Sequence, residues 1–350
     1  MSEVDNSAVQ GLRELNLVHR VTTSATDTSR SLAGVVAVTG ASGFIGRRLI
    51  SRLLVEGVST RRLSRDASRG DVAVDFADPG SLAAALDGVD TVFHCAGRAH
   101  AFAEANDAEL HRQANEWVTL NTARAAAAAG VRRFVFLSSV KAIGEPGAVC
   151  VDESFDAPAE TAYGRSKRAA EQGLEAIAAE TGMQIVCLRL AMVYGPGSRG
   201  NLERMMRLVA AGRFPSLPDT GNRRSLLHVE DLVEAIVLAG RHPAAVQRTY
   251  IVAHPAAVSG RFLFVSMCEA LGRPVPTHQV PVWLLRLAGK VGSAVGTMIR
   301  TRMPLNTQAV DRLLDSACYS PAAFISEIGW QPRVDLLTGL QTLADDAGDG

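Results

Sequence analysis

The chain has 350 residues, of which 47% are hydrophobic, enough to bury one large core or two unequal ones. Its 36 basic and 36 acidic residues give a formal net charge of zero, so neither nucleic acid nor an anionic membrane is indicated as the main partner. The cysteines are odd in number and far apart, and they lack metal-ligand spacing, so no metal is predicted; they are Cys95, Cys150, Cys187, Cys268 and Cys318. We expect them to be buried thiols in a reducing compartment, with the protein cytoplasmic.

Residues 1–33 are polar and rich in serine and threonine, and they lack the apolar core of a signal peptide. This composition predicts a largely flexible extension. No later apolar run reaches the ~18 residues that a membrane span needs. The nearest case, residues 281–299, is interrupted by Arg286 and Lys290. It is predicted to be an amphipathic surface helix, with contact to a membrane surface as a minor alternative.

From residue 35, short apolar runs alternate with longer helical segments. Strands are predicted at 35–39, 58–63, 71–76, 90–97, 131–139 and 183–190, and helices at 44–57, 79–88, about 107–129 and from about Tyr163. Strands that alternate with helices indicate a parallel sheet covered on both faces. The fold class is therefore predicted to be α/β, a doubly wound sheet of Rossmann type.

This alternation stops after Tyr194, where proline- and glycine-rich segments separate further helices. A helix near 229–240 and a strand near 249–253 are predicted to return to the sheet. We expect a dinucleotide-binding domain made of residues 34–190 and about 226–253. About 191–225 and 254–345 would form a smaller, mixed C-terminal lobe that binds the substrate.

The first strand is followed by TGASGFIG and then by a helix, so that Gly40, Gly43 and Gly46 are spaced three residues apart. Such glycines allow a tight turn, a close approach of a pyrophosphate and close packing of helix on strand. The free N–H groups of the helix start suit phosphates. We therefore expect this loop to bind a dinucleotide, with Ser42, Phe44 and Ile45 also in contact. The alternative is a glycine-rich turn in another doubly wound fold.

The second strand ends in RRLSRD, at the place that meets the adenosine ribose in dinucleotide-binding folds. Ser64 occupies the position where an acidic residue would select NAD, and Arg65 follows it. A guanidinium matches a 2′-phosphate well, so NADP(H) is favoured, although Asp66 weakens the argument. NAD(H) remains the alternative, and a solvated basic turn would explain the same residues.

Four residues are predicted to converge on one crevice. Tyr163 and Lys167 lie four positions apart at the start of a helix, on one face. Ser139 ends the preceding strand, at the carboxyl edge where parallel sheets bind ligands. Asn115 lies in the long helix before that strand. A phenol beside an ammonium and a hydroxyl indicates proton transfer, whereas an exposed surface pair is the alternative.

The motifs TGASGFIG, DFAD, HCAG, RQAN, LSSVKAIG, YGRSK, LRLAMVYGPG and RRSLLHVEDL occur in this order over about residues 35–240. This set resembles the extended short-chain dehydrogenase/reductases, the NAD-dependent epimerase/dehydratase family. The resemblance implies that Tyr163 is the catalytic acid/base and that Ser139 hydrogen-bonds the reacting oxygen. Lys167 would lower the pKa of Tyr163 and hold the nicotinamide ribose.

The same resemblance implies further cofactor contacts. Asp75 and Phe76 would lie against the adenine, and Ala96 and Gly97 would line the cofactor cleft. It also implies a homodimer through a four-helix interface formed by the Asn115 and Tyr163 helices.

Two departures from family patterns narrow the chemistry. Ser139 is followed by Val140 and Lys141 where the dehydratases carry an Asp-Glu pair, which makes dehydration unlikely. Met192 occupies the position of the asparagine that is usual in hexose 4-epimerases, which puts plain 4-epimerisation in doubt. Reduction and epimerisation both move a hydride at C4, and the choice between them stays open.

The chain most resembles the branch of UDP-sugar 4-keto-reductases and 4-epimerases that serve surface-polysaccharide synthesis. That resemblance places Asn201, Arg204, Arg223 and Arg224 on the substrate side, where paired arginines would bind a diphosphate. The alternative for each of these residues is a solvated surface position without a ligand. Two other functions stay open: a reductase of small apolar hydroxy or keto compounds, similar to the steroid-dehydrogenase or flavonoid-reductase branch, and a non-catalytic cofactor-binding member.

Overall fold

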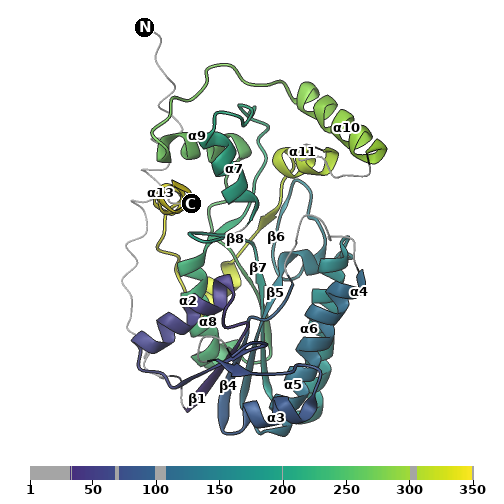
Figure 1. Cartoon of the computed structure of the whole chain (residues 1–350), viewed down its shortest axis with the longest axis vertical. Helices are drawn as coiled ribbons and strands as arrows, with labels where there is room; N and C mark the ends of the chain where they lie inside the picture. The colour runs from purple at the N-terminus through teal and green to yellow at the C-terminus, as the bar shows by residue number, and fades with distance from the viewer. Residues whose placement is uncertain are drawn as a thin grey trace. The chain divides into compact units, whose positions relative to one another are not determined.

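Seven parallel strands form the central sheet of this computed structural model (Figure 1). The structure describes residues 32, 34–67, 71–98, 108–198, 200–299 and 306–348. Nearly all of the predicted N-terminal extension, 1–31 and 33, lies outside the described residues. Leu32, at its end, is buried in the core.

The strands are β1 (Val35–Thr39), β2 (Thr60–Ser64), β3 (Val72–Ala73), β4 (Val89–His94), β5 (Arg133–Ser139), β7 (Gln184–Leu190) and β10 (Arg248–Val252). They lie in the order β10-β7-β5-β4-β1-β2-β3, and every neighbouring pair is parallel. The chain order reverses between β1 and β4, which is where doubly wound sheets bind ligands. The predicted fold class is confirmed.

Helices cover both faces of the sheet (Figure 1). On one face, α2 (Phe44–Val55), α8 (Val229–Arg241) and α12 (Ala322–Ile328) pack their apolar sides into one core. On the other face, α3 (Pro79–Leu86), α5 (Val118–Ala128) and α6 (Ala162–Thr181) form a second core. The central strands β1, β4, β5 and β7 are therefore buried on both sides, which explains their mostly apolar sequences.

The helix predicted over about 107–129 is interrupted. It consists of α4 (Ala108–His111), a π-helical turn (Arg112–Trp117) and α5. A π-helical turn adds one residue to a helix and leaves the apolar spacing on either side almost unchanged. The sequence therefore does not predict this turn. π-helical turns are frequent at functional sites.

A third apolar core belongs to the C-terminal lobe. Its helices are α7 (Asn201–Ala210), α9 (Gly260–Ala270), α10 (Val282–Met298), α11 (Thr307–Leu314) and α13 (Leu336–Gly348). Short parallel pairs join β8 (Met192–Tyr194) to β9 (Leu226–His228) and β6 (Cys150–Val151) to β11 (Cys318–Tyr319). Two 3-10 turns span Val140–Ile143 and Pro243–Ala245. The separate core supports the division into two domains, which stays a proposal.

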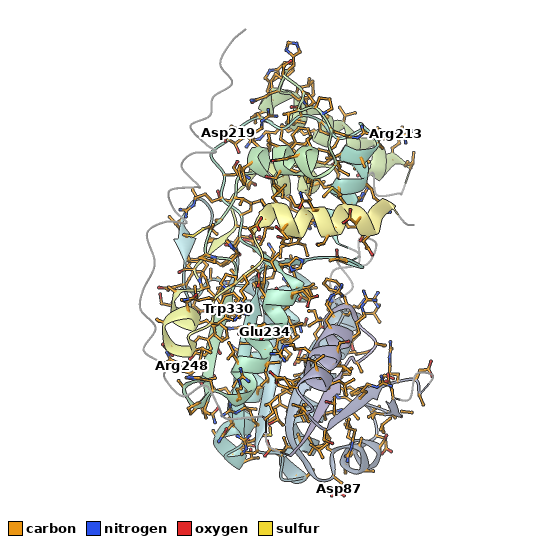
Figure 2. All side chains as sticks on the ribbon, turned by 90° about the vertical axis from the view of Figure 1, so that its left-hand side faces the viewer. Asp87, Arg213, Asp219, Glu234, Arg248 and Trp330 are labelled. Atoms are coloured by element: carbon orange, nitrogen blue, oxygen red, sulfur yellow. A yellow bond between two sulfur atoms is a disulfide. The ribbon has the colours of Figure 1, made fainter. Side chains whose placement is uncertain are left out.

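The segment after α12 is fixed to α8 by hydrogen bonds. The indole N–H of Trp330, which is labelled in Figure 2, donates to the carbonyl of Asp231 at 3.1 Å. The carboxylate of Asp231 accepts from the N–H groups of Arg333 and Val334 at 2.7 and 3.2 Å. Asp231, in the HVEDL motif, is therefore a buried structural residue.

The cysteine prediction is wrong for two residues. A disulfide joins Cys150 to Cys318, which face each other in the β6–β11 pair. They lie 168 positions apart, so their meeting depends on the fold of the lobe. Cys187 and Cys268 are buried free thiols, as predicted, and Cys95 is a free thiol that is partly buried. A disulfide is unusual in a reducing compartment, so the basis for the cytoplasmic prediction is weakened.

We expect the Cys150→Ser/Cys318→Ser double variant to be less stable by roughly 2–4 kcal/mol, because the bond closes a long loop in the unfolded chain. Its Tm in a thermal melt should fall by several degrees. Dithiothreitol should lower the Tm of the wild type similarly and leave that of the variant unchanged. A wild-type Tm that does not respond to reductant would contradict the disulfide.

Candidate active site

The ends of β1 and β4 touch at the point where the strand order reverses. After β1 the chain turns at Gly40, whose φ is +63°, a value that favours glycine. A methyl group on Gly40 would lie 2.8 Å from the backbone nitrogen of Ala96, and one on Gly46 would lie 2.2 Å from the Gly40 carbonyl oxygen. Both positions therefore require glycine, because strand, loop and helix pack backbone against backbone.

This loop leaves the start of α2 open to a ligand. Gly43 precedes the helix and supplies no side-chain cap, while its own N–H donates to the Gly40 carbonyl at 2.9 Å. The first amides of α2 are thus directed out of the helix at the carboxyl edge of the sheet. The donor set and the partial positive charge of a helix start fit the pyrophosphate of a dinucleotide.

Tyr163, Ser139 and Lys167 meet beside this crevice. Ser139 is the last residue of β5, and its hydroxyl lies close enough to that of Tyr163 to lower the pKa of the phenol. Lys167 follows one turn later on α6 and donates from Nζ to the Leu137 carbonyl at 2.7 Å. The fold thus places Ser139 beside Tyr163, with Lys167 one helical turn away on α6.

The electrostatics of the site differ from the expectation. Burial raises the pKa of Tyr163, and the hydrogen bond from Ser139 offsets this only in part. Burial also lowers the pKa of Lys167 to about 8. The predicted lowering of the pKa of Tyr163 by Lys167 is therefore not met in the protein alone. The reason is that the ammonium is directed at the Leu137 carbonyl and lies 4.6 Å from the centre of the Phe136 ring.

Asn115 lies in the π-helical turn and connects three elements of the site. Its Oδ1 accepts from the N–H of Arg98 at 2.7 Å, and its Nδ2 donates to the Arg98 carbonyl and to Ser166 Oγ at 3.2 and 3.1 Å. A methyl group on Gly97 would lie 3.0 Å from Asn115 Oδ1 and 3.4 Å from Lys167 Nζ. Asn115 therefore fixes the segment after β4 against α6.

The sequence analysis missed a buried polar chain beneath the crevice. His94 forms hydrogen bonds through Nδ1 with Thr39 Oγ1 at 3.0 Å and through Nε2 with Thr119 Oγ1 at 3.1 Å. Thr119 donates to the Asn115 carbonyl and Thr39 accepts from the Ala96 N–H, so the pattern fits a neutral imidazole with its proton on Nε2. Burial lowers the pKa of His94 to about 3, which agrees with a neutral imidazole. A histidine within an apolar strand gives no sequence signal of this kind.

His111 is a second residue that the sequence did not reveal. It is fully buried, and its ring lies edge-on to that of Tyr163 with the centroids 5.8 Å apart. The imidazole of His111 therefore packs against the phenol of Tyr163.

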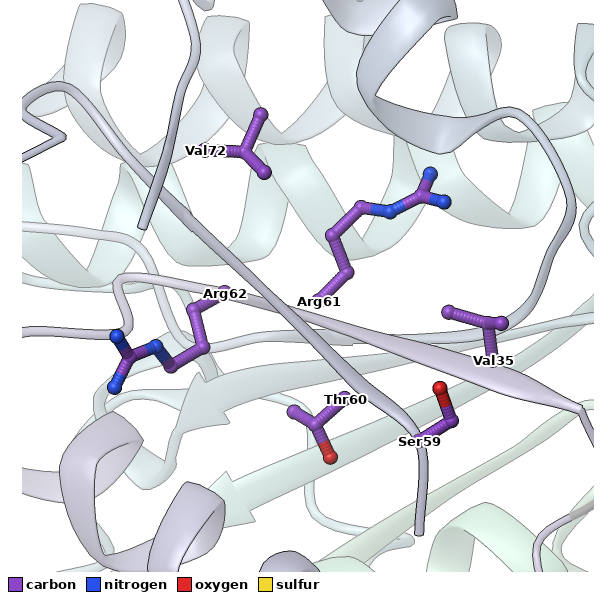
Figure 3. A pocket seen from close by; sticks show the side chains of 6 residues that line it. All are labelled: Val35, Ser59, Thr60, Arg61, Arg62 and Val72. Atoms are coloured by element: carbon purple, nitrogen blue, oxygen red, sulfur yellow. The ribbon is translucent and has the colours of Figure 1, made fainter. Parts of the chain in front are cut away.

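The basic residues at the end of β2, where the adenosine ribose is expected, have different surroundings. The hydroxyl of Ser64 is bonded to the carbonyl of Asp66 within its own turn, and Arg65 is exposed. Arg61 donates to the carbonyls of Ala85 and Asp87, each at 2.8 Å, and Arg62 Nε lies 3.0 Å from Asp71 Oδ1. Arg61 and Arg62 extend from opposite sides of β2 beside a pocket of about 260 Å³ at the starts of β1 and β2, away from the glycine loop (Figure 3).

The predicted adenine residues lie just beyond β3. Asp75 is exposed, and its Oδ1 accepts from the Ala77 N–H at 2.9 Å. Phe76 is buried in the core beneath α3. Their contact with adenine stays a prediction.

The predicted substrate residues are placed unequally. Asn201 is exposed at the start of α7, and Arg204 is half-buried on the same helix. Arg223 is exposed, whereas Arg224 is half-buried and donates from Nη1 to the Asp315 carbonyl at 2.9 Å. The pKa of Arg224 is lowered by burial, and the carboxylate of Glu145 offsets part of this shift. Arg224 therefore lies near the loop that follows Ser139.

Comparison with known proteins gives one consistent result. The sequence profile described as the NAD dependent epimerase/dehydratase family matches residues 36–253. A UDP-glucose 4-epimerase of Vibrio cholerae is 32% identical over 90% of this chain and 96% of its own length. A 3-beta-hydroxysteroid dehydrogenase of Mycolicibacterium neoaurum is 27% identical over 91% and 92%.

A solved structure, MoeE5 in complex with UDP-glucuronic acid and NAD, is 25% identical and covers 90% of this chain and 99% of its own, with a TM-score of 0.70. The fold that carries the glycine loop and the Tyr163 helix is thus shared with proteins of known activity. This chain therefore belongs to the NAD dependent epimerase/dehydratase family and is an enzyme of the extended short-chain dehydrogenase/reductases.

Proposed function

We propose that this enzyme moves a hydride at C4 of a nucleoside-diphosphate sugar, by 4-keto-reduction or 4-epimerisation, in the synthesis of surface-polysaccharide sugars. The observation that carries the proposal is the position of Tyr163 beside Ser139 at the carboxyl edge of the sheet, one helical turn from Lys167. The similarity to a UDP-glucose 4-epimerase over 90% of the chain supports the substrate class.

The chain's own residues would handle the proton. A nicotinamide dinucleotide held over the glycine loop would supply or accept the hydride. Tyr163 would give its proton to the C4 oxygen as a ketone becomes an alcohol, or take that proton in the reverse direction. Ser139 would hold the same oxygen by a hydrogen bond, and Lys167 would hold the ribose.

The raised pKa of Tyr163 fits the role of proton donor that the reductive direction requires. Burial raises the pKa of Tyr163, so the phenol is protonated at neutral pH and ready to donate. Use of Tyr163 as a base would require its pKa to fall from ~10 to near neutrality, which corresponds to about 4 kcal/mol. In the protein alone no group near Tyr163 supplies a shift of that size, among the residues described.

We expect Tyr163→Phe to lower kcat by about 10³-fold, because the general acid is removed. Its Kd for NADPH should stay within about twofold of the wild type, since the phenol is not a predicted phosphate or ribose ligand. Stopped-flow turnover and fluorescence titration measure the two quantities. Full turnover in this variant would exclude Tyr163 as the acid.

We further propose that the enzyme prefers NADP(H). The exposed Arg65 at the end of β2 is available to a 2′-phosphate, whereas Arg61 and Arg62 are engaged elsewhere. Ser64 brings no negative charge to this position.

Arg65→Ala should therefore weaken NADPH binding by roughly tenfold and change NADH binding little, because only NADPH carries the 2′-phosphate. Arg62→Ala is the matched control, since it removes an arginine that is paired with Asp71. Equal losses for both dinucleotides, or a larger effect of Arg62→Ala, would disprove the role of Arg65. Isothermal titration gives the four Kd values.

For the substrate we propose that Arg224 contributes a cation to the diphosphate. It is half-buried near Glu145, whereas Arg223 is exposed and its backbone N–H donates to Ser316 Oγ at 3.0 Å. Asn201 and Arg204, on α7, would contact the sugar nucleotide from the other side of the lobe. The influence of the Glu145 carboxylate on Arg224 supports this choice, because Glu145 follows the 3-10 turn after Ser139.

A thermal-shift panel with NAD(H), NADP(H), UDP, dTDP and GDP tests this proposal. We expect a stabilisation of several degrees by one nucleoside diphosphate, in addition to that by the dinucleotide. Arg224→Ala should remove the shift by the nucleoside diphosphate, whereas Arg223→Ala should retain most of it. If no nucleoside diphosphate shifts the Tm while a dinucleotide does, the substrate class is wrong.

That last outcome would favour a second candidate, a reductase of a small apolar hydroxy or keto compound. The relative described as a 3-beta-hydroxysteroid dehydrogenase supports it, because the similarity covers 91% of this chain.

A homodimer through the Asn115 and Tyr163 helices is also proposed. Trp117, on the first of these helices, is 43% exposed and would be covered by the partner.

A further inference from the structure

Helix α10 is attached to the lobe by one row of small and apolar residues. Leu285 is buried in the third core, and a methyl group on Gly289 would lie 2.9 Å from Val310 Cγ2. Ser293 Oγ accepts from the N–H of Thr307 at 3.0 Å. These residues are spaced i, i+4, i+8, so they form one face, and this face packs on α11.

The opposite face of α10 is apolar and exposed. Trp283, Leu287 and Val291 form a second i, i+4, i+8 row that is offset from the first by two residues, or about 200° around the axis. Their exposed fractions are 66%, 49% and 54%. Leu284, Val295 and Met298 extend this surface, with Met298 82% exposed. We call these six residues the apolar face of α10. An exposed patch of this kind marks an interaction site.

The segment around this face is basic, although the whole chain is neutral. Residues 270–310 contain no aspartate or glutamate, and they contain Arg273, Arg286, Lys290, Arg300 and Arg302. The rest of the chain has 31 basic and 36 acidic residues. Arg286 and Lys290 are exposed and lie on α10 beside the apolar face. An apolar surface flanked by cations fits a partner that is both apolar and anionic.

We propose that α10 lies flat on an anionic membrane surface, with its apolar face among the headgroups and upper acyl chains and Arg286 and Lys290 at the lipid phosphates. A tryptophan at one end and basic residues on the flank are typical of interfacial helices. The helix has 17 residues and is about 25 Å long, shorter than the hydrocarbon core. None of the helices in the described ranges is long and apolar enough to cross a bilayer.

A second copy of the chain is a poorer partner. In a two-fold symmetric contact the same patch meets itself, so Arg286 and Lys290 of both copies would come together. Residues 270–310 offer no acidic side chain to pair with them. The membrane satisfies both properties of the surface, and this inference does not depend on the substrate of the enzyme. The outward placement of α10 beside α11 is visible in Figure 1.

Vesicle flotation with the full chain tests the proposal. We expect at least tenfold more binding to vesicles of phosphatidylcholine with 40% phosphatidylglycerol than to phosphatidylcholine alone. Trp283→Ser/Leu287→Ser and Arg286→Glu/Lys290→Glu should each reduce this binding at least tenfold. Leu54→Ser/Val55→Ser is the control for the apolar change, because these residues are 58% and 85% exposed on α2. Arg213→Glu/Arg333→Glu makes the same change in net charge at exposed positions outside α10.

The remaining outcomes overturn the proposal. These are no binding to anionic vesicles, equal binding to neutral ones, or control variants that lose as much binding as the α10 variants. A change of molecular mass in Trp283→Ser/Leu287→Ser by light scattering would assign the face to a second copy instead. Circular-dichroism melts of all four variants verify that each is folded, so that a loss of binding reports on the surface itself.

Discussion

The reversal of strand order between β1 and β4 is the constraint on which the site depends. At this point the backbone of Gly40 meets that of Ala96 with no room for a side chain. A chain that brings two strand ends this close leaves a crevice lined by backbone amides and by the start of α2. The residues that follow β4 and β5 lie at the same edge of the sheet, because all seven strands are parallel.

A buried polar chain supports this crevice from below. Thr39 ends β1, His94 ends β4, and Thr119 and Asn115 belong to the interrupted helix. Each of these polar groups has a partner, so the chain stabilises one arrangement of three elements instead of leaving buried groups unsatisfied. The π-helical turn is what directs Asn115 at Arg98, so the irregularity of the helix has a positional role.

Apolar spacing and special residues predicted most of the sheet and the centre of the site. The spacing of apolar residues predicts most strands and helices of the sheet. The strand–loop–helix context predicts the roles of Gly40 and Gly46, and the places of Ser139 at a strand end and of Tyr163 at a helix start predict the centre of the site. The structure added the features that depend on contacts between distant segments. Cys150 and Cys318 meet only because β6 pairs with β11, and no local pattern encodes that pairing.

Helix α10 illustrates the same limit. Its amphipathic character was predicted, but a sequence that is apolar on two sides does not show which side packs on the lobe. That choice depends on Gly289, whose missing side chain lets α11 approach.

Burial of Tyr163 and Lys167 explains why their positions are fixed while the pKa of Tyr163 is not lowered. Burial holds Tyr163 and Lys167 in fixed positions, yet it favours the neutral form of each, since it raises one pKa and lowers the other to about 8. A lysine with a pKa near 8 is mostly charged at neutral pH, and its charge is directed at a carbonyl oxygen instead of the phenol. Among the described residues no charge lowers the pKa of Tyr163, so we expect a shift toward the phenolate to come from charges that enter the cleft with the ligands. The protein alone is therefore set to donate a proton, and the molecules that bind in the crevice decide whether Tyr163 also accepts one.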